Sequence, residues 1–545
     1  MQVNDFKAIK NMSCLEKNLA YIRSEYKKFR DMEMPELTEE LFNYFYATGQ
    51  RQEYEQKYFV RRGALLMSAM MCFIYGEDEH FETLLRIIND ICAEKTWAFP
   101  AHMSEGTLHP ERVIDLFSAE TGHALTEICE FLGSKLPVDI IEKIRVEVET
   151  RIINPFIEEI FPWETFNHNW AAVCGGAVGM TFLYAFPEKF NLVEKRINGA
   201  LKSYLSGFGD DGISTEGLGY WNYGFWYFTG FADLYKERCG VDLMNNSKVK
   251  NIAMCQQNMF LTDNSVISYG DCVRHEQYHS GLAHYLRNRY GSDIRIINDK
   301  ISSGVDHCYR FLSCTRTFMW TDKNLAGLKE AKPSESYFKD AEWYINRKAK
   351  FSFTAKSGSN GGNHNHNDVG SFIIAGEEGQ LIADFGSGEY THEYFNEGRY
   401  DYLCNSSRGH NVPIIDGKYQ SAGQSFKGKV IWNGAGVFEL DMAEAYAGVI
   451  KRLKRKFNLN DNYIELTDVF EFNDDSKHDI TERFVSVIKP KITDGKVTIG
   501  SMVIECDETP ILGSEHLQNH AAEDDVLYFV DYKSNTTFKI KFIMQ

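Results

Sequence analysis

The sequence predicts an α+β protein with two domains, a helical N-terminal half and a C-terminal antiparallel β-sandwich. From about residue 40 to residue 311, apolar residues recur at the spacing of amphipathic helices. From Tyr344 onward they alternate with polar residues in short segments that Gly, Asn and Asp interrupt. A change of apolar period along one chain indicates two domains of different class.

The helical half is built of apolar segments with short breaks. Residues 63–75 and 81–92 both carry the helical pattern, and the polar residues 75–79 separate them. Breaks this short join neighbouring antiparallel helices, so we expect successive helix pairs. A further helix is expected from Arg112 onward.

The C-terminal half contains several predicted strands. Residues 350–355, 462–468 and 537–543 alternate apolar and polar side chains, as half-buried strands do. A polar run over residues 323–336, which includes residues 331–335 (Ala-Lys-Pro-Ser-Glu), marks the boundary. We therefore expect domains at residues 1–325 and 335–545.

Composition excludes several classes of protein. The chain has 545 residues, 43% of them hydrophobic and 25% charged, as in ordinary globular proteins. Its formal net charge of -18 argues against a nucleic-acid binder or an anionic-membrane binder, since both partners require a basic surface. The sequence shows no long apolar span and no signal-peptide pattern, so we expect a cytoplasmic protein that is not membrane-bound. The 12 cysteines include no CxxC pair and are expected to be reduced thiols.

A histidine-rich turn is the strongest chemical signal. Residues 361–368 read Gly-Gly-Asn-His-Asn-His-Asn-Asp and precede the apolar segment 369–375. Gly and Asn give the backbone the freedom to aim imidazole rings at one point. His366, together with Asp384 and His410 further along, would form a zinc set of two histidines and one carboxylate. A solvated polar loop with one capped histidine is the alternative.

Three aromatic and polar clusters lie in the helical half, each at the start of a predicted helix. Sugar-binding clefts use aromatic faces with Asn, His and Tyr among them, and loops at one end of a ring of helix pairs can converge. Each cluster also has a structural explanation, with the tryptophans in the core, His168 at a helix start and the aspartates in turns. The clusters are Trp97 with His102; Asn167, His168 and Asn169; and Asp210, Asp211, Glu216, Tyr220, Trp221 and Tyr223.

Together with the histidine turn, these clusters resemble the heparinase II/III-like polysaccharide lyases over roughly residues 58–542. The resemblance implies an N-terminal (α/α) toroid, which is an incomplete helical barrel, followed by a β-sandwich. It also implies a structural zinc held by His366, Asp384 and His410. A tyrosine and a histidine or asparagine of the toroid, and a histidine of the sandwich, would face the substrate.

These residue types suit β-elimination of uronic acid polymers. A base removes the C5 proton beside the carboxylate, and the 4-linked oxygen leaves with a proton, so the site needs hydrogen-bond donors, a base and an acid. Tyr223 is the predicted acid, with Tyr220 as the alternative. The predicted donors and histidines are Asn167, Asn169, His168 and His364, with the division between the two asparagines open. Substrate contacts are expected from Trp97, His102, Glu216, Trp221 and Arg408.

The expected substrate is an anionic oligosaccharide, derived from a glycosaminoglycan such as heparin or heparan sulfate, or from alginate, and cleaved from an end. Two alternatives belong to other classes. An unsaturated-uronyl hydrolase would use Asp210, Asp211 and Glu216 as its acid and base, and a non-catalytic sugar-binding protein would use the histidines only structurally. A homo-oligomer is compatible with the sequence.

Overall fold

The computed structural model describes residues 5–330, 333–362, 364–391 and 393–545. Two compact units are distinguished. The first takes in the chain up to Phe208 with Asn222–Ala253 and Tyr278–Glu330, and the second takes in Gly209–Trp221, Met254–Gln277 and the chain beyond Glu330. Ala331 and Lys332 of the predicted boundary, and Asn363 of the histidine turn, lie outside the described residues.

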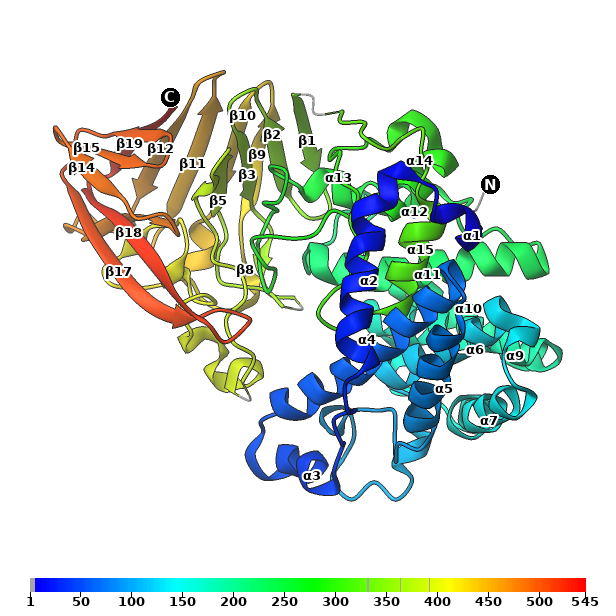
Figure 1. Ribbon diagram of the computed structural model, residues 1–545. Helices are drawn as coiled ribbons and strands as arrows, with labels where there is room; N and C mark the ends of the chain where they lie inside the picture. The colour runs from blue at the N-terminus through cyan, green and yellow to red at the C-terminus, as the bar shows by residue number, and fades with distance from the viewer. Residues whose placement is uncertain (1–4, 331–332, 363, 392) are drawn as a thin grey trace. The chain divides into compact units, whose positions relative to one another are not determined.

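Helices make up the first unit, coloured from blue to green in Figure 1. They follow one another with short connections, as the predicted helix pairs require. They are α1 (Phe6–Ile9), α2 (Glu16–Arg30), α3 (Glu39–Thr48), α4 (Gln52–Ile74), α5 (Asp78–Cys92), α6 (Leu116–Leu132), α7 (Val138–Val148), α8 (Asn154–Glu158), α9 (Asn169–Ala185), α10 (Glu194–Ser206), α12 (Ser247–Ala253), α14 (Ser280–Tyr290) and α15 (Phe311–Trp320), with most of α11 (Leu218–Cys239).

The small residues of α9 allow α11 to approach closely. A Cβ atom added at Gly176 would lie 2.7 Å from the backbone oxygen of Tyr227, and one added at Gly179 would lie 2.5 Å from the ring of Phe231. Any larger side chain at either position would push the two helices apart. The glycines of this helix are therefore required by packing.

The start of α6 differs from the prediction. The sequence pattern predicts a helix from Arg112, but Pro110–Arg112 forms a single 3₁₀ turn and α6 begins at Leu116. The side chain of Asp115 accepts a hydrogen bond from the backbone N–H of Ser118 at 2.8 Å. Because a side-chain cap at this position satisfies an otherwise unpaired amide, the helix begins after Asp115.

A buried ionic network joins three helices of the first unit. Both guanidinium Nη atoms of Arg316 donate to the carboxylate of Glu127, at 2.8 and 2.7 Å, and the ring Nε2 of His123 lies 3.0 Å from it. Burial disfavours the charged carboxylate, but Arg316 and His123 together hold the pKa of Glu127 well below its usual range. The pair is therefore ionised in the core, where its loss would be costly.

The second unit is built on antiparallel sheets. One sheet has the strand order β1-β2-β3-β5-β6, a longer one β14-β15-β16-β19-β12-β11-β10-β9, a third β17-β18-β13-β7 and a small one β4-β8. The strands are β1 (Ser334–Phe338), β2 (Trp343–Arg347), β3 (Ser352–Lys356), β4 (Ser359–Asn360), β5 (Phe372–Gly376), β6 (Gly379–Ile382), β7 (Ile414–Ile415), β8 (Gly423–Lys427), β9 (Lys429–Gly434), β10 (Val437–Asp441), β11 (Arg452–Leu459), β12 (Tyr463–Glu471), β13 (Ile480–Ser486), β14 (Lys491–Thr493), β15 (Lys496–Ile499), β16 (Met502–Glu505), β17 (Pro510–Gln518), β18 (Asp524–Ser534) and β19 (Thr537–Met544).

The long sheet buries one face and exposes the other. Side chains along β11 alternate between buried and partly exposed, and β12 pairs with β19 in the register Leu466 opposite Ile540. The buried side chains pack against those of β3 and β5, such as Phe353 and Phe372, to form the sandwich core. Alternation along the strand thus becomes burial on one face. The predicted strands 350–355, 462–468 and 537–543 correspond to β3, β12 and β19.

All 12 cysteines are free thiols, as predicted. Within the described ranges, no helix combines the length and the apolar character needed to cross a bilayer.

Replacing Arg316 with Met is expected to lower the free energy of unfolding by about 3–5 kcal/mol, because it leaves the Glu127 carboxylate buried without its cation. Denaturant unfolding followed by helical circular dichroism measures the change. The control is Lys95→Met, which removes a partner of Glu39 from a pair with side chains 65% and 72% exposed. It should cost less than about 1 kcal/mol. Equal losses in the two variants would contradict the role given to Arg316.

Candidate functional site

Three side chains of the second unit meet although they lie far apart in the sequence. The ring of Tyr220, in the first turn of α11, stacks on the imidazole of His364 with ring centroids 4.6 Å apart. The hydroxyls of Tyr220 and Tyr390 are 2.8 Å apart and hydrogen-bonded. An imidazole and two phenols in contact are groups that can donate and accept protons at one place.

Asp271 holds this cluster together from below the histidine turn. Its carboxylate accepts hydrogen bonds from Nδ1 of His364 at 2.8 Å and from Nε2 of His366 at 3.0 Å. It also accepts from the Tyr394 hydroxyl at 2.6 Å and from Nη2 of Arg399 at 2.9 Å. Burial opposes the negative charge, but these bonds and the charge of Arg399 hold the pKa of Asp271 well below its usual range.

The backbone places Asp271 against the histidine turn. The N–H of Asp271 donates to the carbonyl of His364 at 3.0 Å, and a Cβ atom at Gly270 would lie 2.6 Å from that carbonyl oxygen. His364 itself has a φ of 56°, in the left-handed region. The Gly and Asn residues around it allow this turn, as the sequence predicts. The sequence analysis missed Asp271, whose only local signal is the Gly270 that precedes it.

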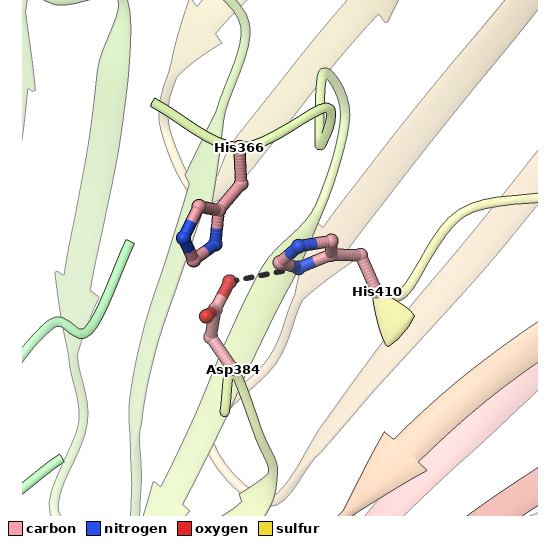
Figure 2. Close-up of side chains that lie close together, drawn as sticks. All are labelled: His366, Asp384 and His410. Carbon is pink, nitrogen blue, oxygen red and sulfur yellow. Dashed lines mark hydrogen bonds and ion pairs between the residues drawn. The ribbon is translucent and has the colours of Figure 1, made fainter. Parts of the chain in front are cut away.

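A second cluster lies on the other side of Asp271. One ligand atom from each of His366, Asp384 and His410 lies within 4.8 Å of the others, and the three side chains are fully buried. Figure 2 shows them pointing toward one another. Nδ1 of His410 is 3.1 Å from a carboxylate oxygen of Asp384. Burial opposes charge on both groups, yet their mutual attraction lowers the pKa of Asp384 and raises that of His410.

The outer nitrogen of each histidine already has a partner. Nε2 of His366 faces Asp271, and Nε2 of His410 lies 2.9 Å from the carbonyl oxygen of Cys404. Nδ1 of His366 is buried and has no hydrogen-bond partner among the described residues. Histidines that bind metal usually donate their other ring N–H to a carboxylate or carbonyl group. The two Nδ1 atoms and the carboxylate of Asp384 are thus arranged as metal ligands would be.

Asn411 anchors the segment that carries His410. Its side-chain amide donates to the carbonyls of Phe372 at 2.8 Å and Ala383 at 2.7 Å. Its side-chain oxygen accepts from the N–H of Val485 at 2.7 Å. These bonds tie His410 to the strand that leads into Asp384, which explains why an asparagine follows the histidine.

Tyr223 belongs to the first unit and has different partners from Tyr220. Its hydroxyl donates to the Glu120 carboxylate, and the guanidinium of Arg310 lies 3.7 Å from its ring centroid. Burial raises the pKa of Glu120 to about 7, although Arg310 acts in the opposite direction. The predicted acid is therefore bonded to a carboxylate and covered by a cation, while the alternative, Tyr220, contacts a histidine.

The asparagine and histidine motif lies where it was predicted, at the start of α9. His168 is the residue before the helix, and its ring stacks on Phe166 at 4.8 Å. Its Nδ1 lies 3.3 Å from the side-chain oxygen of Asn169. Asn167 is exposed and Asn169 is buried, so only the former has a freely accessible amide. Their roles toward a substrate carboxylate stay a prediction.

The residues predicted to contact substrate have mixed surroundings. Trp97 is 1% exposed and donates its indole N–H to the carbonyl of Ile91, and Trp221 is 0% exposed. Both rings are core residues, which corrects the prediction that they stack on a sugar. Nδ1 of His102 is 2.7 Å from the Asp115 carboxylate. Glu216 and Arg408 are partly exposed, and their predicted roles are untested.

Asp211, proposed for the alternative hydrolase, has a structural role. One of its carboxylate oxygens accepts from the backbone N–H of Ile213 at 3.2 Å and the other from that of Asp340 at 2.8 Å. Asp340 in turn accepts from the N–H groups of Asp210 and Asp211 at 2.6 and 3.2 Å. A carboxylate used in this way shapes a turn, as the structural explanation of these residues predicts.

Comparison with known proteins identifies the second unit directly. Residues 330–503 match the family described as Heparinase II/III-like, C-terminal. None of the curated proteins matches the sequence significantly.

Solved structures match nearly the whole chain. A heparinase III superposes with a TM-score of 0.60 at 12% identity, covering 99% of this chain and 93% of its own. A heparan sulfate lyase HepC mutant from Pedobacter heparinus gives 0.58 at 10% identity, with 99% and 92% covered. The Streptomyces coelicolor A3 chondroitin AC lyase, in complex with chondroitin sulphate, gives 0.57 at 9% identity, with 97% and 79% covered.

Likeness at these identities establishes the fold, an (α/α) toroid followed by an antiparallel β-sandwich, as the sequence predicts. The resemblance to the heparinase II/III-like polysaccharide lyases is thus confirmed, by sequence over residues 330–503 and by fold over nearly the whole chain.

Proposed function

We propose that this chain is a polysaccharide lyase that cleaves uronic-acid-containing oligosaccharides by β-elimination. The contact between Tyr220 and His364, with Asp271 behind the histidine, is the observation that carries the proposal. It brings a base and an acid together on one structural unit, as proton abstraction next to a carboxylate followed by departure of an alkoxide requires.

The histidine is oriented for the role of base. When Nδ1–H donates to Asp271, the neutral imidazole keeps its lone pair on Nε2. Nε2 of His364 takes the C5 proton, the electron pair of the C–H bond forms the C4–C5 double bond, and the C4–O bond breaks. The leaving oxygen takes a proton from the hydroxyl of Tyr220. The products are a 4,5-unsaturated uronyl end and a free hydroxyl.

Tyr220 replaces Tyr223 as the proposed acid. Tyr220 is the tyrosine in contact with His364, whereas the hydroxyl of Tyr223 is engaged by Glu120. The change is one of three residues along the same helix, α11.

The substrate class follows from the relatives and from local charge. The solved structures of this fold are named as heparin, heparan sulfate and chondroitin lyases, so a glycosaminoglycan is the proposed substrate, with alginate as the alternative uronide. Arg399 places a cation beside Asp271 in a chain whose net charge is -18. Cleavage from the end of an oligosaccharide is part of the proposal.

We also propose that His366, Asp384 and His410 bind a structural zinc ion. The fit rests on the partner-less Nδ1 of His366 and on the outer bonds of both histidines, described above. Two imidazoles and one carboxylate are ligands that zinc favours. Bound there, the ion would cross-link the strand end at Asp384 with the His366 and His410 segments and would hold Asp271 in place through His366.

The first prediction is that ultraviolet absorbance rises when the purified protein is incubated with uronide oligosaccharides, because β-elimination creates a conjugated unsaturated uronate. A panel of heparan sulfate, chondroitin, hyaluronan and alginate oligosaccharides, read by absorbance and mass spectrometry, identifies the substrate and the end that is cleaved. A fall in absorbance with unsaturated oligosaccharides would instead establish the hydrolase alternative.

The second prediction compares two matched variants. Tyr220→Phe should lower kcat by roughly 10² to 10⁴, the range expected when a general acid is removed, with little change in KM. Tyr223→Phe should retain most of its kcat, since it loses only the bond to Glu120. Steady-state kinetics on the best substrate of the panel measures both. The reverse pattern would return the role of acid to Tyr223.

The third prediction concerns the metal. Elemental analysis of protein purified without added metal should find about one zinc per chain, as expected for a closed site of this ligand type. His366→Ala should lose the zinc and lower the melting temperature, because metal binding contributes to folding.

His364→Ala is the matched control for the metal site, two residues away in the same turn. It should retain zinc and lose elimination. Zinc retained in His366→Ala but lost in His364→Ala would exchange the roles of the two histidines.

A further inference from the structure

A second histidine approaches the candidate site from a part of the chain that the family match does not reach. His520 lies in the connection between β17 and β18, beyond residues 330–503. A β-bridge between Gly388 and Asn519 joins this connection to the segment after β6. The N–H of Glu389 also donates to the carbonyl of Gln518 at 3.3 Å. The hairpin tip is thus held against the segment that carries Tyr390.

Side chains at this junction form a continuous series of hydrogen bonds. Nδ1 of His520 lies 3.2 Å from the hydroxyl oxygen of Ser387. Ser387 is hydrogen-bonded through its side chain to Tyr390, whose hydroxyl is 2.8 Å from that of Tyr220. The series therefore runs from His520 through Ser387 and Tyr390 to Tyr220.

The two ends of the series differ in their contact with solvent. Ser387 is 4% exposed, and Tyr390 and Tyr220 are partly buried, whereas His520 is exposed. The imidazole of His520 also contacts the ring of Tyr390 edge-on, with centroids 4.5 Å apart. A hydroxyl group can donate one hydrogen bond while it accepts another, and imidazole can exchange protons with water near neutral pH. The series thus has the composition of a path for protons.

Elimination creates a need for such a path. When Tyr220 protonates the leaving oxygen, it becomes a phenolate and must recover a proton before the next turnover. Burial raises the pKa of Tyr220 well above its usual value, so the phenolate is a strong proton acceptor. The proton taken from C5 resides on the base, a different group.

We propose, on the basis of the proposed lyase function, that His520, Ser387 and Tyr390 form a relay that returns a proton from solvent to Tyr220. His520 gives its Nδ1 proton to Ser387, Ser387 gives its hydroxyl proton to Tyr390, and Tyr390 gives its own to the phenolate. His520 then takes a proton from water or buffer, and the C5 proton leaves the base to solvent. No net proton is gained or lost, and these three residues act through Tyr220 without contacting the reacting atoms.

Contact with Tyr390 could also serve packing alone. Tyr390 lies against an apolar cluster that includes Phe385, Tyr394 and Leu527. A structural role and a relay differ in one measurable respect. A small acid dissolved in the buffer can replace a missing relay, but it cannot replace a missing packing contact.

The test compares His520→Ala with His516→Ala. His516 lies in β17, is 69% exposed and pairs with Asp524 at 2.9 Å, so it matches His520 in type and position without reaching Tyr390. His520→Ala should lower kcat by roughly tenfold, less than the 10²-fold or more expected for Tyr220→Phe, and leave KM unchanged. Added imidazole should restore kcat in proportion to its concentration. His516→Ala should match the wild type. Unchanged kcat in His520→Ala, or a loss that imidazole does not restore, would overturn the relay.

A measurement without substrate separates the relay from the function on which it rests. In protein labelled with ¹³Cζ-tyrosine, Tyr220→Phe and Tyr390→Phe assign the two signals. Ser387→Ala and His520→Ala should shift the Tyr390 signal, and His516→Ala should not; the absence of a shift overturns the relay. Elimination by the wild type without imidazole rescue rejects the relay and leaves the lyase proposal standing. A wild type that eliminates no uronide rejects both, even where the Tyr390 signal moves.

Discussion

The carboxylate of Asp271 is the constraint on which the candidate site depends. It is buried, and an unpaired charge in that position would cost several kcal/mol. Four donors from the second unit surround it, namely two imidazoles, one phenol and one guanidinium. Each bond that offsets the cost of burial also fixes the orientation of one functional side chain. The stability of this carboxylate and the geometry of the site are therefore the same set of interactions.

Asp271 also couples the two histidines of the turn. His364 and His366 are two residues apart, and they direct different ring nitrogens at the two oxygens of one carboxylate. His364 is left with Nε2 for chemistry, while His366 is left with Nδ1 for a metal ion. A change in metal occupancy would pull on His366 and, through Asp271, on His364. A structural ion at this place would thus act on the reaction by holding the base, without contacting substrate.

The second unit brings its functional groups from four stretches of sequence. Tyr220 comes from the start of α11, Asp271 from the Met254–Gln277 segment, His364 from the histidine turn and Tyr390 from the segment after β6. The hairpin of β17 and β18 then covers Tyr390 and brings in His520. The sandwich core positions these segments, because their strands are buried on one face and their connections converge at the ends.

The sequence by itself determined the class of each half, because helical and strand periodicities of apolar residues are local properties that burial imposes. It also determined the ligand set His366, Asp384 and His410, since such residue types beside Gly and Asn have few other uses, and the structure brings their atoms together. It could not choose between Tyr220 and Tyr223, which are three residues apart on one helix and differ only in what packs against them. Nor could it identify Asp271 or His520, whose importance lies in contacts with residues far away in the chain, or exclude Trp97 and Trp221, whose rings the core encloses. Tertiary structure decided these points, because long-range contacts leave no periodic trace in a single sequence.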